Sequence, residues 1–129
     1  SVLIRIEEIA DTQKRVSRLL SNAQLWDETL LGIKEISEDI KNNYNNVMKA
    51  YYTNDKKIAL EIEINHENLI EKCNNFLENA SKHFSAEIKD SKQLGMLYKK
   101  NTDIANIAGF KKSALSYIRR IARIVLSMD

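Results

Sequence analysis

The sequence predicts an all-α protein, an antiparallel bundle of three, or four, long helices. The chain of 129 residues contains no proline and only three glycines, so few residues interrupt a helix. Apolar residues recur at alternating three- and four-residue steps along most of the chain, which is the spacing of one helix face. Long helices joined by short turns pack antiparallel, and we therefore expect one bundle domain over residues 1–129.

The N-terminal segment, residues 1–22, is expected to be a helix because an apolar repeat begins at Ile6. Two interpretations stay open for the region near Ser21. A break there makes this segment a fourth helix, separate from a three-helix unit at 25–128. Without a break, it is continuous with the next helix.

A second helix is expected to start near Trp26, since an apolar series runs from Trp26 to Tyr51 in seven alternating steps. The stretch YTNDKK at 52–57 predicts the turn that follows. Asn54 or Asp55 can cap the next helix, because either side chain offers an oxygen to free main-chain amides.

The third and fourth helices are predicted by apolar series over residues 59–84 and 94–125. Between them, DSKQ at 90–93 fits a helix cap. The last series contains two polar members, Asn101 and Lys111, with a glycine between them. We therefore expect the last helix to be bent or interrupted.

Charge is unevenly distributed along the chain. Residues 1–90 hold 12 basic and 16 acidic residues, whereas residues 91–129 hold 8 basic and 2 acidic ones. Either the two parts complement each other across helices, or the basic part meets an acidic partner. The single cysteine, Cys73, and the lack of any long uncharged apolar run predict a soluble protein of the reducing cytoplasm.

Sequence motifs for catalysis are missing: there is no Gly-rich phosphate loop, Gly-x-Ser-x-Gly elbow or Cys-x-x-Cys pair. We expect neither an enzyme nor a cofactor. In EINH at 63–66, Glu63 and His66 share a helix face, as in one half of a di-metal bundle site, but no second copy follows. We interpret His66 as buried and hydrogen-bonded to a neighbouring helix, and keep Glu63, His66 and Glu67 as weak metal candidates. His83 is expected to be solvated.

The stretch SYIRRIARIVL at 116–126 places three arginines in a helix that is otherwise apolar. Together with a lysine seven residues before the first of them, these arginines form what we call the basic stripe: Lys112, Arg119, Arg120 and Arg123. Guanidinium groups bind carboxylates or phosphates in a fork geometry, so we predict that the stripe contacts a partner. The alternative is salt bridges to glutamates of the adjacent helix, at positions 61, 63, 67 and 71.

Two stretches resemble the PhoU family of phosphate-uptake regulators. VMKAYYTNDKKIALEIEINHENLIEK at 47–72 is similar to the turn into the family's second helix, where an alanine sits four residues after an aspartate, here Ala59 after Asp55. SALSYIRRIARIVLSM at 113–128 is similar to the family's third-helix motif. The resemblance covers about residues 25–128, which is one three-helix repeat where the family usually has two.

The resemblance implies a cytoplasmic regulatory adaptor that docks on the ATPase of a phosphate transporter, or on a signalling kinase, and restrains phosphate uptake. Acidic positions that bind metal clusters in some members fall on Arg119 and Arg123, which have no lone pair for a cation, so no cluster is expected. Self-association through residues 2–20 is expected to rebuild the two-repeat form. The alternatives are a self-association domain without a ligand and nucleic-acid binding by the basic C-terminal helix.

Overall fold

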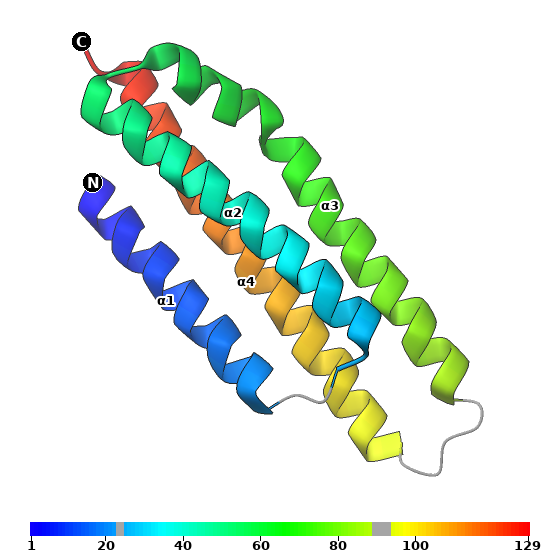
Figure 1. Cartoon of the computed structure of the whole chain (residues 1–129). Helices are drawn as coiled ribbons and strands as arrows, with labels where there is room; N and C mark the ends of the chain where they lie inside the picture. Colours follow the sequence, from blue (N-terminus) through cyan, green and yellow to red (C-terminus); the bar gives the residue numbers. More distant parts are fainter. Residues whose placement is uncertain (23–24, 89–93) are drawn as a thin grey trace.

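The computed structural model describes residues 1–22, 25–88 and 94–129. They form four α-helices and no strand: α1 (Val2–Asn22), α2 (Asp27–Thr53), α3 (Lys56–Ile88) and α4 (Leu94–Ser127). Consecutive helices run in opposite directions, so that α2 and α4 run against α1 and α3 (Figure 1). The predicted all-α fold is confirmed, and α1 is a helix separate from α2.

The turn between α2 and α3 is built as its sequence predicts. Asn54 ends α2 in the left-handed conformation, with φ 50° and ψ 44°, which asparagine tolerates better than most residues. Asp55 then caps α3, because its Oδ1 accepts hydrogen bonds from the amides of Lys57 at 3.1 Å and Ile58 at 3.2 Å. The Asn54 side chain also donates to the main-chain oxygen of Asp129 at 3.0 Å, so the turn is held against the end of α4.

Helix α4 is the centre of the bundle. It packs against each of the other three helices, whereas α1 has no close backbone neighbours in α2 or in the described part of α3. Several of its large apolar side chains are fully buried, among them Ile104, Ile107, Leu115, Ile118 and Ile121. The result is an open bundle in which α2, α3 and α4 pack on one another and α1 covers a further side of α4.

The predicted interruption of the last helix is wrong, because α4 is one helix from Leu94 to Ser127. Gly109 is exposed, and a Cβ atom at this position would meet no neighbour within 4 Å. Lys111 is buried in the core but hydrogen-bonded there, so its polar group does not force a break. The cap predicted at 90–93 lies outside the described residues.

The apolar side of α1 packs against another helix of the same chain. Val2, Ile9, Thr12 and Val16 are buried, and α4 is the helix on which α1 packs. The buried side of residues 2–20, the segment expected from the sequence to bind a second copy, therefore packs on α4 of the same chain, whereas Leu3 and Ile4 are exposed; self-association through this segment stays a prediction.

Candidate functional site

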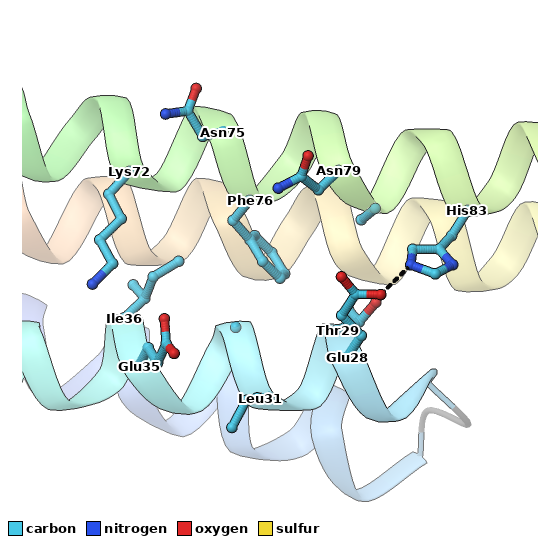
Figure 2. A pocket seen from close by; sticks show the side chains of 12 residues that line it. Glu28, Thr29, Leu31, Glu35, Ile36, Lys72, Asn75, Phe76, Asn79 and His83 are labelled. Carbon is cyan, nitrogen blue, oxygen red and sulfur yellow. Dashed lines mark hydrogen bonds and ion pairs between the residues drawn. The ribbon is translucent and has the colours of Figure 1, made fainter.

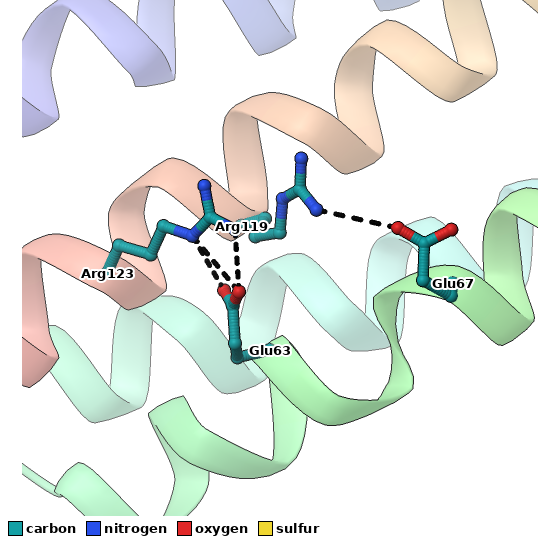
Figure 3. A network of polar contacts seen from close by, with 4 residues as sticks. All are labelled: Glu63, Glu67, Arg119 and Arg123. Carbon is teal, nitrogen blue, oxygen red and sulfur yellow. Dashed lines mark hydrogen bonds and ion pairs between the residues drawn. The ribbon is translucent and has the colours of Figure 1, made fainter.

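Two members of the basic stripe, Arg119 and Arg123, form ion pairs with α3 (Figure 3). Arg123 binds Glu63 with Nε 3.0 Å from each carboxylate oxygen and Nη2 2.7 Å from Oε1. Arg119 Nη1 lies 3.6 Å from Oε1 of Glu67. The hydrogen bond from Arg123 is the main cause that lowers the pKa of Glu63. For these two arginines the structure shows the salt-bridge alternative.

The other two members of the basic stripe have different neighbours. Lys112 Nζ donates to Oδ1 of Asn74 on α3 at 2.9 Å. Arg120 is exposed, and its guanidinium carbon lies 5.8 Å from the ring centroid of Tyr117 in the same helix. Within the described residues Arg120 has no carboxylate partner, so it is the arginine of the stripe that an external group reaches most easily.

The weak metal candidates, Glu63, His66 and Glu67, do not assemble a metal site. In the part of the chain that the structure describes, no three His, Cys, Asp or Glu side chains converge so as to hold an ion. His66 is buried as predicted, at 3% exposure, but its Nδ1 has no hydrogen-bond partner, so the expected hydrogen bond is not formed at this atom. Burial, with a smaller contribution from Arg119, lowers the pKa of His66.

A groove of about 330 Å³ lies between α2 and α3 (Figure 2). The Phe76 ring enters it from α3, opposite Gly32, where a Cβ atom would lie only 2.8 Å from the ring. At one end His83 Nε2 lies 2.7 Å from Oε2 of Glu28, and its ring stacks on Trp26 with centroids 5.5 Å apart. His83 is therefore paired and half-buried, and not simply solvated as expected. Its partners are far away in sequence, so helix spacing gives no signal for them.

A second groove, of about 340 Å³, lies between α1 and α2. Its lining is mostly apolar and consists of Ile6, Ile9, Ala10, Gln13, Ser37, Ile40, Lys41 and Tyr44. Beneath it, Lys111 Nζ of α4 donates to Ser37 Oγ at 2.7 Å and to Gln13 Oε1 at 3.5 Å. Sequence reasoning missed this groove because it exists only where α1 and α2 stand apart on α4.

No protein-family model, curated protein or solved structure matches this chain. The likeness to the PhoU family therefore stays a prediction from the two stretches at 47–72 and 113–128. None of the described helices combines the length and apolar character needed to cross a membrane.

Proposed function

We propose that this protein is a helical adaptor that acts through protein–protein contacts, and that the outward face of α3 beside the basic stripe is its contact surface. The observation that carries this is a pair of large apolar side chains in solvent, Leu60 at 49% and Ile64 at 65% exposure. Four residues apart in one helix, they lie next to each other on the same face. Adjacent exposed apolar side chains mark sites of protein interaction more often than single ones.

Charged side chains border this apolar pair. Glu63 follows Leu60 by three residues and Glu67 follows Ile64 by three, so each glutamate is a neighbour on the helix surface. Both glutamates are paired with arginines of α4, which reduces the freedom of these long side chains. Apolar anchors supply affinity, and ordered charges around them supply orientation and a fast encounter.

For the identity of the partner we propose the one that the PhoU resemblance implies, the ATPase of a phosphate transporter or a signalling kinase. The protein would then regulate phosphate uptake in the cytoplasm without catalysing a reaction. The stretches at 47–72 and 113–128 support this choice, and the proposed surface draws on both of them. Nucleic-acid binding is less favoured, because Arg119 and Arg123 already bind carboxylates of the same chain.

Affinity capture from a native lysate tests the proposal, with the full chain and its Ile64→Arg variant as parallel baits. We expect wild type to retain a transporter ATPase or a kinase and Ile64→Arg to lose it. The matched control is Leu31→Arg, since Leu31 is 59% exposed on α2 and lies outside the proposed surface. Equal retention by wild type and Ile64→Arg, or equal loss with Leu31→Arg, contradicts the proposal.

A charge swap, Glu63→Arg with Arg123→Glu, separates binding from folding. The swap keeps an ion pair between α3 and α4 but exchanges the places of the two charges. We expect stability close to wild type and weaker capture, because the partner meets the opposite charge pattern. Nuclease added to half of each sample shows whether the retained material depends on nucleic acid, which would favour the alternative function.

A further inference from the structure

Lys111 is a buried lysine without a counter-charge in the described part of the chain. The residue is 2% exposed, and among the described residues it takes part in no ion pair. Cys73 does not compensate it, because burial raises the pKa of this thiol and keeps it neutral. A buried charge is tolerated in a protein when it is paired and hydrogen-bonded. Here only neutral acceptors are present.

Some N–H donors at and beside Lys111 have no hydrogen-bond acceptor. An ammonium group only donates, so Gln13 must turn its Oε1 toward Lys111 and its Nε2 away. That Nε2 is buried and has no partner among the described residues. The ammonium itself has three N–H bonds, and its acceptors there are Ser37 and Gln13. Lys111 and Gln13 therefore each keep an N–H donor without an acceptor, and the two donors lie close together. Oxygen atoms of a ligand would accept hydrogen bonds from both.

Gln13 and Ser37, the two acceptors of Lys111, line the groove between α1 and α2 together with several apolar side chains, whereas Lys111 itself lies behind them and does not line it. The two helices are antiparallel (Figure 1), and Gln13 of α1 and Ser37 of α2 come close to each other, because both accept hydrogen bonds from Lys111. The part of α1 that lines the groove, residues 6–13, is about 10 Å long at the rise of an α-helix. The groove thus carries the polar side chains Gln13 and Ser37 at one end, apolar side chains along its wall, and the exposed Lys41 on α2.

The dimensions favour a single alkyl chain. The volume of about 340 Å³ is near the lower limit for small-molecule pockets. A helix of a protein partner is about 10–12 Å across with its side chains, so a groove of this volume does not enclose one. An extended hydrocarbon chain is much narrower and fits between α1 and α2.

We propose that this groove binds an amphiphilic carboxylate, a medium-chain fatty acid, with its carboxylate at Lys111 and Gln13 and its chain along Ile6, Ile9, Ile40 and Tyr44. The carboxylate supplies the missing counter-charge and the missing acceptors at once. The site is separate from the contact surface on α3, so the inference does not rest on the proposed function.

Titration calorimetry with the full chain tests this site, with decanoate, decanol and decyltrimethylammonium as probes below their micelle concentrations. Decanoate is expected to bind at least about tenfold more tightly than decanol, since a hydrogen bond to a charged group contributes about that much. The cationic probe should not bind. Equal affinity for decanoate and decanol, or no binding of decanoate, overturns the proposal.

Three variants locate the binding. Lys111→Met keeps an unbranched side chain, one atom shorter and without charge, and should abolish the preference for decanoate over decanol. Lys112→Met, the matched control, removes a lysine that contacts α3 and should bind as wild type does. Ala10→Phe fills the groove from an exposed position, so it tests the site even if Lys111→Met does not fold, and it should abolish binding of both probes. Unchanged binding by Ala10→Phe, or equal losses in the two lysine variants, overturns the proposal.

Discussion

At the scale of single residues, Lys111 shows how a lysine can occupy the core of a helical bundle. Burial lowers its pKa, because a low-dielectric surrounding disfavours the charged form. The Ser37 hydroxyl at 2.7 Å is the shorter of its two hydrogen bonds. Ser37 also donates to the main-chain oxygen of Ile33 at 2.8 Å, which leaves its lone pairs free for the lysine.

We therefore expect Ser37→Ala to lower the free energy of unfolding by about 1–3 kcal/mol, the cost of leaving a buried polar group unsatisfied. Ser81→Ala is the control, since Ser81 makes the same kind of bond to the preceding turn, to Leu77 at 3.0 Å, but is exposed. Its effect should stay within about 0.5 kcal/mol. Urea unfolding measures both. Equal losses in the two variants would contradict this role of Ser37, and adding Lys111→Met to Ser37→Ala should recover much of the loss.

The lowered pKa of His66 predicts that the free energy of unfolding decreases in acid. Its pKa is lowered in the folded state by burial and then by Arg119, so the unfolded chain takes up this proton more readily than the folded one. The free energy of unfolding should therefore fall as the pH drops below about 6.5, the ordinary value for histidine, and continue to fall until the folded-state pKa is reached.

The pH effect is measured as the urea midpoint between pH 7.5 and 5, for wild type and for His66→Leu, which cannot titrate. The variant should lose less of its stability over this range than wild type does. Identical slopes in the two proteins would show that other groups cause the acid sensitivity.

At the scale of helices, two glycines in helix interiors have opposite surroundings. Gly109 of α4 faces open space, whereas a Cβ atom at Gly32 of α2 would lie 2.8 Å from Cδ2 of Phe76 on α3. Alanine is favoured over glycine in a helix by about 0.5–1 kcal/mol. Gly32 is thus needed for the close approach of α2 and α3, and Gly109 is not.

We expect Gly109→Ala to raise the free energy of unfolding by about 0.5–1 kcal/mol. Gly32→Ala should lower it by about 1 kcal/mol, because overpacking against the Phe76 ring exceeds the gain in helix propensity. Urea unfolding compares the two, and Phe76→Leu combined with Gly32→Ala should relieve part of the clash. A stabilised Gly32→Ala would mean that the ring moves aside without cost.

At the scale of the whole molecule, α4 connects the other three helices through one core. Ile118 is fully buried, and its cluster includes side chains of all four helices. The basic character of α4 is partly balanced in the same way, since Arg119 and Arg123 pair with glutamates of α3. Apolar contacts and charge both make α4 the helix on which the fold depends.

Truncation of Ile118 to alanine should therefore cost about 2–5 kcal/mol of unfolding free energy in a single cooperative transition. Ile64→Ala is the control, because this isoleucine is 65% exposed and should change stability by less than about 0.5 kcal/mol. Circular dichroism during urea unfolding follows both variants. Separate transitions for α1 and the other helices in Ile118→Ala would contradict a core shared through α4.

The helical character of the chain and the turn at 52–57 were determined by the sequence alone, because they depend on local features: apolar spacing, the absence of proline, and Asp55 three residues from an amide that it caps. The separation of α1 from α2 was left open by the sequence. The sequence also showed Asn101 and Lys111 as polar members of an apolar series, from which we expected the last helix to be bent or interrupted. The burial of Lys111 depends on Gln13 and Ser37, which lie 98 and 74 residues away.

Tertiary structure decided the rest. The salt bridges of Arg119 and Arg123 depend on the packing of α3 on α4, and Glu63 lies 60 residues from Arg123 in sequence. His83 pairs with Glu28, which lies 55 residues earlier in the chain. The groove between α1 and α2 exists because α1 packs on α4 and not on α2. Helix periodicity shows which face of a helix is buried, but not which helix buries it, since any apolar face of similar shape can fill that place.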